Sequence, residues 1–183
     1  MTLPDLKHRA QRETSGGLDE RVMNEIVIRD ASHDDVPLIV QMIHRMVEDL
    51  TRYGGHAPAT DRAALQKMEA MIAEAIKGDS KYLIAESADG DPLGVTGAEL
   101  ITLGGAFAPK RTIHVHVVYV LPQFRRGGIA SILLARMLDW GRAVDAEQCT
   151  LNVFSNNPAR SLYEKNGFSE FELKLARPLQ SGD

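Results

Sequence analysis

The stretch from Thr112 to Val144 constrains the fold of this chain more than any other part of the sequence. It opens with a run rich in β-branched residues, Thr112–Val120, which predicts a strand. A turn with Pro122 and the glycines Gly127 and Gly128 follows, and apolar residues then recur at helical spacing as far as Val144. A strand, a glycine-containing turn and a helix in immediate succession indicate a fold that mixes helices with a sheet.

Further elements are expected on both sides of this stretch. Strands are expected over residues 25–29, 82–85, 92–103 and 149–154, and one or two more over 168–175. Helices are expected after a capping box of Ser32 and Asp35, from Thr60 to Gly78, and from Asn157-Pro158 to Asn166-Gly167. Because strands and helices do not alternate strictly, we predict an α/β fold with a mixed sheet rather than a simple βαβ repeat.

Composition bounds the number of domains and the class of partner. The length of 183 residues and the apolar content of 44% indicate a single domain, expected over residues 25–183. Residues 1–24 carry mixed charges and scattered apolar residues, so we expect a disordered or loosely ordered tail there. The formal net charge of −4 argues against the broad positive surface that a non-specific nucleic-acid binder needs.

Cysteine content and hydropathy exclude further classes. The single cysteine, Cys149, leaves no intrachain disulfide and no multi-cysteine zinc module. No apolar run reaches the length of about 18 residues that a membrane-spanning helix needs. The N-terminus also lacks the apolar stretch of a secretory signal. The sequence therefore predicts a cytoplasmic protein with neither a membrane nor a nucleic acid as its partner.

The turn between the strand and the helix has the features of an anion site. The start of a helix leaves unpaired N–H groups with a partial positive charge, and glycines let a ligand approach the backbone closely. Arg125 and Arg126 add local positive charge, so a pyrophosphate is a plausible ligand. The turn has neither the Walker pattern nor the Gly-x-Gly-x-x-Gly pattern of dinucleotide-binding proteins. A tight turn with two solvated arginines is the alternative interpretation.

Two blocks, in this order along the chain, carry a family resemblance. The first is Arg125-x-x-Gly128-x-Ala130, and the second runs from Asn156-Asn157-Pro158-Ala159 through Leu162-Tyr163 to Gly167-Phe168. They resemble the Arg/Gln-x-x-Gly-x-Gly/Ala and Asn-x-x-Ala-x-x-Leu-Tyr-x-x-x-Gly-Phe blocks of the GNAT superfamily of acyl-CoA-dependent N-acetyltransferases. Ala130 stands where glycine is commoner. The resemblance covers residues 25–175 and implies a mostly antiparallel sheet of six or seven strands flanked by about four helices.

The resemblance also implies a cosubstrate and its binding residues. In such enzymes the pyrophosphate of acetyl-CoA lies on backbone N–H groups of the turn, and the pantetheine arm follows the preceding strand, which diverges from the strand at 149–154. The Val118 N–H would donate to the oxyanion of the reaction. The residues that this comparison assigns to acetyl-CoA binding are Val118, Val120, Arg125, Arg126, Gly127, Gly128, Ile129, Ala130, Asn156 and Tyr163.

The implied reaction moves an acetyl group to a primary amine of a small molecule or a peptide by direct attack in a ternary complex. The departing thiolate needs a proton, and Tyr163 is suited to supply it because a phenol has a pKa of about 10. The alternative is that Tyr163 only packs between a helix and the sheet. Glu48 and Asp49 lie in the 44–62 region, which would form the acceptor wall, and could attract a cationic amine; a solvated helix end explains them equally well.

The sequence identifies the general base, which would deprotonate the amine, less clearly than the general acid. Many GNAT members have a glutamate two residues before the position of Val118, where this chain has His116, with His114 two residues earlier. This His-x-His pair is similar to that of serotonin N-acetyltransferase. Strand alternation places His114, His116, Val118 and Val120 on one face. Glu99 is an alternative base, and hydrogen bonding at a sheet surface is an alternative role for the histidines. A metal pair would lack a third ligand, so no metal is expected.

Two other functions share this fold. One is a non-catalytic acyl-CoA-binding or regulatory domain, and the other is a transferase for a longer acyl group. An intact Tyr163 and the polar pair at 114 and 116 favour catalysis. GNAT members are often dimers, so a homodimer is also an expectation.

Overall fold

The computed structural model describes residues 26–104 and 108–177, and a mixed sheet forms its centre. Within these residues the sheet has five strands: β1 Val27–Asp30, β2 Ser80–Glu86, β3 Pro92–Leu103, β4 Lys110–Val120 and β5 Gln148–Leu151. They lie side by side in chain order. The first four are antiparallel, whereas β5 is parallel to β4. The predicted mixed, mostly antiparallel sheet is confirmed, with five strands rather than six or seven.

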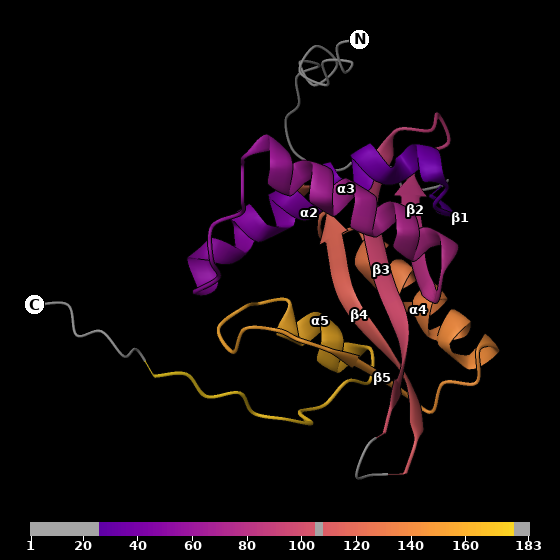
Figure 1. Cartoon of the computed structure of the whole chain (residues 1–183), viewed down its shortest axis with the longest axis vertical. Coiled ribbons are helices and arrows are strands. Elements are labelled where there is room, and N and C mark those ends of the chain that lie inside the picture. Colours follow the sequence, from indigo (N-terminus) through magenta and orange to yellow (C-terminus); the bar gives the residue numbers. More distant parts are fainter. Residues whose placement is uncertain (1–25, 105–107, 178–183) are drawn as a thin grey trace, which may run out of the picture.

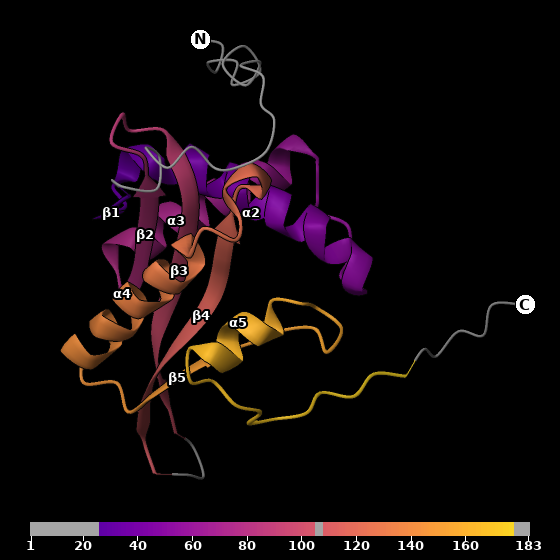
Figure 2. The same ribbon diagram turned by 180° about the vertical axis from the view of Figure 1, so that it is seen from behind.

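Helices cover both faces of the sheet. Helices α2 Val36–Leu50 and α3 Arg62–Lys77 pack on one face, and α4 Ile129–Ala143 packs on the other (Figures 1 and 2). The short helix α5, Arg160–Lys165, lies beside β5 in both views. Four α-helices in the described residues agree with the fold that the sequence implied.

Two hydrophobic clusters follow from this layering. Ile39 and Met42 of α2 pack with Ile84 and Val95 on one face of the sheet. The other cluster contains the predicted inward positions of α4, Ile129, Leu133 and Met137, which are almost fully buried. Burial of an apolar side chain stabilises a fold by about 1.5–3 kcal/mol. The helical spacing in the sequence therefore identified the face of α4 that holds it on the sheet.

The N-terminus of one helix agrees with the sequence prediction, and the N-termini of two others differ from it. The capping box of Ser32 and Asp35 is present before α2. Helix α3 is capped by Asp61 and not by Thr60, because the Asp61 carboxylate accepts the Ala64 N–H at 2.9 Å. Asn157 accepts the Ala159 N–H at 2.9 Å, and α5 therefore begins later than Pro158.

The expected strand over 168–175 is absent from the structure. Gly167, with φ of 86°, ends the α5 region as predicted. Residues 168–177 then continue without strand pairing. The last part of this segment extends beyond the body of the helices and sheet (Figures 1 and 2). Its alternating pattern favours a strand, but a strand forms only where a neighbour supplies backbone partners.

Two further expectations concern the termini and the membrane. The tail expected at 1–24 lies outside the described residues. Within the described ranges, no helix has the length and the apolar content that crossing a membrane requires.

Candidate active site

Strands β4 and β5 separate part-way along the sheet. Their pairing extends from Thr112 opposite Gln148 to Val115 opposite Leu151, where β5 ends, while β4 continues to Val120. Beyond Val115, one edge of β4 therefore has no strand beside it among the residues that the structure describes. Backbone groups on such an edge can pair with an extended ligand.

A β-bulge at His116 interrupts the alternation of β4. Gly97 of β3 lies opposite Val117, and the next residue, Ala98, lies opposite Val115, so His116 is the extra residue. A bulge of this kind reorients the side chains on either side of it. The expectation of strict alternation through His116 is therefore wrong.

The bulge changes which residues share a face of the sheet. Val115 packs in the cluster under α4, whereas Val117 packs in the cluster under α2 and α3. Val118 and Val120 again belong to the α4 side. His116 contacts Tyr82, a member of the α2 and α3 cluster. The single face predicted for both histidines with Val118 and Val120 is therefore divided between the two sides of the sheet.

The His116 ring is held by Tyr82. The Tyr82 hydroxyl lies 2.9 Å from His116 Nε2, and the two rings meet edge to face with centroids 5.5 Å apart. Gly97 makes room for this contact, because a Cβ there would lie 2.5 Å from the Tyr82 ring and 3.1 Å from His116 Nε2. Burial of part of the ring lowers the pKa of His116, against the raising effects of Glu99 and the His114 backbone. The neutral form, which can accept a proton, is favoured.

His114 is held from the β5 side. Its Nδ1 lies 2.9 Å from the Thr150 hydroxyl, and the Asn152 amide nitrogen lies 3.4 Å from its Nε2. Glu99 is its register partner on β3. We call Tyr82, Glu99, His114, His116 and Thr150 the histidine cluster. Within the described ranges, no group of three or more His, Cys, Asp or Glu side chains could hold a metal ion.

The turn before α4 presents its backbone outward. Arg126 and Gly128 have left-handed backbones, with φ of 69° and 80°, and Gly128 is the N-cap of α4. A Cβ at Gly128 would meet no atom of the described chain within 4 Å, so the space beside this backbone is open. The unpaired N–H groups of the first turn of α4 therefore adjoin space that an anion can occupy.

The Arg125 side chain is already engaged within the protein. Its Nε donates to the Val120 carbonyl at 2.9 Å, one terminal nitrogen lies 2.6 Å from the Asp49 carboxylate, and the guanidinium lies 5.3 Å from the Tyr119 ring centroid. Asp49 also pairs with Arg52 at 2.9 Å. Arg125 thus fastens the turn to α2, and neither its charge nor that of Asp49 is free, whereas the Arg126 side chain is exposed.

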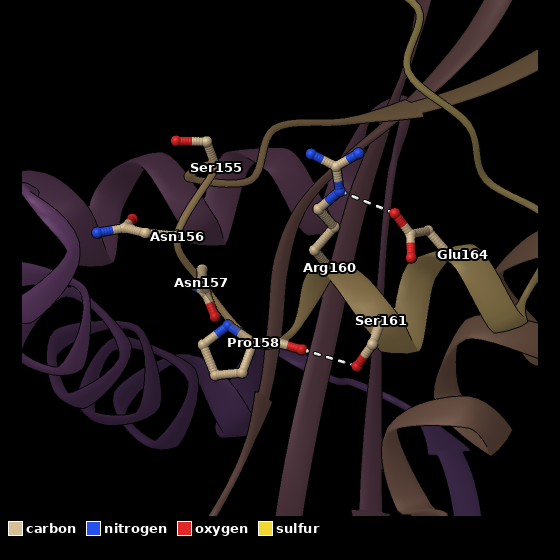
Figure 3. A pocket seen from close by; sticks show the side chains of 7 residues that line it. All are labelled: Ser155, Asn156, Asn157, Pro158, Arg160, Ser161 and Glu164. Atoms are coloured by element: carbon tan, nitrogen blue, oxygen red, sulfur yellow. Dashed lines mark hydrogen bonds and ion pairs between the residues drawn. The ribbon is translucent and has the colours of Figure 1, made fainter.

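Within the described residues, no contact joins Tyr163 or Asn156 to the histidine cluster. Tyr163, on α5, packs edge to face on Phe168 with centroids 6.1 Å apart, and burial raises its pKa. Among the described residues, its hydroxyl makes no hydrogen bond and no contact joins it to either histidine. Asn156 lines an open hollow of about 370 Å³ opposite Arg160 and Glu164 (Figure 3). That hollow includes neither the histidines nor the turn before α4.

Tyr82, Thr150 and Asn152 were not anticipated from the sequence. Each falls within an expected strand, where a tyrosine, a threonine or an asparagine carries no local signal of a contact across the sheet. Gly97 was the available signal, because an isolated glycine inside a strand often marks a bulge or a close approach of another group.

Comparison with known proteins identifies the family. A family model described as "Acetyltransferase (GNAT) family" matches residues 43–168, well over half of the chain. The chain belongs to the GNAT family of acetyltransferases. The match includes β4, the turn before α4 and the Tyr163 block, so the separated strands and the open turn are parts of a GNAT domain.

Individual relatives agree with this assignment. An uncharacterised N-acetyltransferase of Bacillus subtilis, YhfO, is 28% identical over 107 residues, which cover 58% of this chain and 70% of that protein. A variant of the BH1408 protein from Bacillus halodurans has the same fold, with a TM-score of 0.72 at 18% identity, over 84% of this chain and 99% of that one. A predicted acetyltransferase from Clostridium acetobutylicum, solved with acetyl-CoA, has a TM-score of 0.70 at 20% identity, over 84% and 96% of the two chains.

Proposed function

We propose that this GNAT protein transfers an acetyl group from acetyl-CoA to a primary amine of a small molecule or a peptide. The observation that carries the proposal is the continuity of two surfaces: the open edge of β4 beyond Val115 leads directly into the turn before α4. An extended arm that ends in a pyrophosphate matches such a surface. The presence of acetyl-CoA in the Clostridium acetobutylicum relative supports this choice of ligand.

The backbone supplies most of the binding groups in this proposal. N–H groups of Arg126, Gly127, Gly128, Ile129 and Ala130 receive the pyrophosphate, and Arg126 adds a positive charge that has no partner among the described residues. The edges of Val118 and Val120 pair with the pantetheine arm, and the Val118 N–H donates to the oxyanion. Arg125 supports the turn through Asp49 rather than through a phosphate, and Asn156 lies near the reacting sulfur.

Side chains of the protein transfer the protons of the reaction in this proposal. An alkylammonium, with a pKa of about 10, must lose a proton before its nitrogen can attack the thioester carbon. His116 accepts that proton through water, with His114 as a second relay. The new C–N bond forms, the C–S bond breaks, and the thiolate takes a proton from Tyr163. The tyrosinate then recovers the second proton of the amine, and the His116 imidazolium releases the first one to solvent, so protons and charges balance.

The test is CoA release measured against a panel of amines. We expect acetyl-CoA to yield free CoA and acetylated amine only when the protein and a suitable primary amine are both present. Calorimetry that shows acetyl-CoA binding without turnover on any amine would instead support a non-catalytic domain. Faster turnover with a longer acyl-CoA would correct the acyl group, and no CoA binding at millimolar ligand would overturn the proposal.

A further inference from the structure

Glu99 is the carboxylate of the histidine cluster, and it has no partner of its own. Its side chain is exposed, and within the described residues no hydrogen bond or ion pair engages it. The other members of the cluster are paired, Tyr82 with His116 and His114 with Thr150, each at 2.9 Å. A carboxylate left free among paired polar side chains can bind a cation that comes from solution.

The Glu99 side chain lies beside His114, on the face of the sheet that carries α2 and α3. Its neighbours in β3, Ala98 and Leu100, pack in the cluster under α4, so strand alternation directs Glu99 to the opposite face. His114 lies directly across from it on β4, where paired residues have Cβ atoms about 4.5–5.5 Å apart. Burial lowers the pKa of His116, and the negative charge of Glu99 opposes that effect, so this carboxylate lies within electrostatic reach of the His116 ring.

The direction from His116 toward Glu99 is open, whereas the opposite direction along β4 is closed. Helices α2 and α3 cover Val117 and Tyr119, which are 2% and 5% exposed. Glu99 and His116 both remain exposed. An acceptor whose nitrogen reaches His116 therefore extends from there along the exposed part of the sheet, past Glu99.

The spacing along the strands sets the length of an acceptor that reaches both groups. Val118, whose N–H is the proposed oxyanion donor, lies opposite Thr96, three residues before Glu99 in β3. At a rise of about 3.4 Å per residue, the two points are about 10 Å apart along the sheet. An acceptor bound at both ends therefore carries its second binding group well beyond the nitrogen that reacts.

The carboxylates of the expected acceptor wall are less available than Glu99. Asp49 is held by Arg125 at 2.6 Å, and Glu48 lies beside His44, with 3.5 Å between Oε1 and Nδ1. Of these three carboxylates, Glu99 is the one without a partner among the described residues. Its negative charge favours an acceptor with a positive group at the far end.

We propose that the acceptor is a diamine: one amine loses its proton and attacks the thioester, and the other stays protonated and binds the Glu99 carboxylate. Glu99 then selects the acceptor and is not the base. An alkylammonium has a pKa of about 10, so the second amine keeps its charge at neutral pH. This inference rests on the proposed acetyl transfer and names the class of its substrate.

The first test compares turnover on three acceptors of similar length, 1,6-diaminohexane, hexylamine and 6-aminohexanoate. We expect kcat/KM, measured by CoA release, to be roughly tenfold higher for the diamine than for hexylamine, as one charge-assisted hydrogen bond in partial exposure would give. The value for 6-aminohexanoate should be the lowest, because its far end is negative. If the diamine gains no more over hexylamine than its two equivalent amines provide, the proposal is wrong, although acetyl transfer stands.

Glu99→Gln separates selection of the acceptor from catalysis. It should reduce the ratio of kcat/KM for the diamine to that for hexylamine toward the value that two equivalent amines alone would give. Asp89→Asn removes an exposed carboxylate from the turn at the other end of β2 and β3, and as the matched control it should keep the native ratio. If Glu99→Gln lowers both values equally, the ratio is unchanged, Glu99 is the base, and the proposal is overturned.

The second test needs no turnover. The ring resonances of His114 and His116 are followed by NMR during titration with 1,6-diaminohexane or hexylamine, at constant pH and ionic strength. The diamine should shift them at lower concentrations than hexylamine does, and Glu99→Gln should remove that difference. This result in a protein that releases no CoA would support Glu99 as the cation site while refuting acetyl transfer. Identical titrations of the native chain and Glu99→Gln would overturn the proposal even if the protein acetylates amines.

Discussion

At the scale of single residues, one hydrogen bond controls the state of His116. The Tyr82 hydroxyl lies 2.9 Å from Nε2, and Tyr82 itself is only 6% exposed. When this hydroxyl donates, the neutral ring must carry its proton on Nδ1. We propose that Tyr82 is a positioning residue, which holds the orientation of the proposed base and, as the donor of this bond, its tautomer.

Replacing Tyr82 by phenylalanine tests this role. Tyr82→Phe keeps the ring that packs against His116 but removes the hydroxyl. We expect the neutral His116 to shift toward the Nε2–H tautomer, which the nitrogen chemical shifts of the ring report by NMR. Tyr119→Phe is the control. Tyr119 is the other buried tyrosine in the hydrophobic cluster under α2 and α3, and its change should leave the tautomer of His116 unchanged. An unchanged tautomer in Tyr82→Phe would remove Tyr82 from the site.

The lowered pKa of His116 predicts a pH dependence of stability. Burial disfavours the imidazolium, so the pKa of His116 lies below its ordinary value of 6.5 in the folded chain. Between these two values the unfolded chain binds more protons, so the free energy of unfolding rises with pH. The contribution of the neutral His116 ring to the free energy of unfolding is complete above pH 6.5. It is lost as the pH falls toward the pKa of His116 in the folded chain.

His116→Gln should remove this contribution. Urea unfolding at about pH 7.5 and about pH 5.5 measures it as the difference in unfolding free energy between the two conditions. We expect a smaller difference for His116→Gln than for the native chain. His33→Gln also removes an imidazole, but at a position outside the histidine cluster, and should behave as the native chain does. Equal differences in all three proteins would contradict the lowered pKa of His116.

Tyr163 makes a separate prediction about turnover. Burial raises the pKa of Tyr163, which keeps the phenol protonated and able to act as an acid. Tyr163→Phe removes that proton and retains the packing on Phe168. Turnover should fall by about 10²- to 10⁴-fold, while acetyl-CoA affinity changes little. If turnover is unchanged when chemistry limits the rate, Tyr163 only packs.

At the scale of elements, the junction of β4 and α4 divides its two arginines between different tasks. Arg125 uses its guanidinium to join the turn to Asp49 of α2. Arg126, with its left-handed backbone, leaves its side chain exposed beside the N-terminus of α4. A helix N-terminus and a free guanidinium attract the same kind of anion, so their effects on a pyrophosphate should add.

Arg126→Ala should therefore weaken acetyl-CoA binding without loosening the fold. We expect roughly a tenfold increase in the dissociation constant by calorimetry, consistent with a charge-assisted hydrogen bond of about 1.5–3 kcal/mol in partial exposure. Arg136→Ala, another exposed arginine further along α4, is the matched control and should bind as the native chain does. Equal affinities for all three proteins would place the pyrophosphate elsewhere.

Local patterns predicted these elements better than the contacts between them. Apolar spacing identified the buried face of α4, and the capping box located the start of α2. The bulge at His116 could not be inferred, because it depends on how β3 and β4 pair over their whole length. The strand expected over 168–175 failed for a related reason: its pattern specifies a strand but not which sheet supplies the neighbour.

At the scale of the whole molecule, the proposed ligand joins parts of the chain that are far apart in sequence. The pantetheine arm of acetyl-CoA would follow β4, its pyrophosphate would meet the N-terminus of α4, and its thioester would approach the histidine cluster. A ligand that binds only the folded state raises stability by mass action, by about 2.7 kcal/mol at one hundred times its dissociation constant.

Acetyl-CoA should accordingly raise the melting temperature of this protein in proportion to the logarithm of its concentration. Differential scanning calorimetry across a range of acetyl-CoA concentrations measures the shift, and adenosine diphosphate alone should give a smaller one, because it lacks the pantetheine arm. A shift of the same size for both ligands would show that the open edge of β4 contributes nothing to binding.

Gly97 also limits how this sequence can change over evolutionary time. A Cβ at this position would lie 2.5 Å from the Tyr82 ring, so every side chain other than hydrogen displaces a group that holds His116. Descendants that retain both aromatic partners must therefore retain this glycine. A lineage can replace it only after Tyr82 or His116 has already been altered. The order in which substitutions occur at these three positions is therefore constrained, as well as their identity.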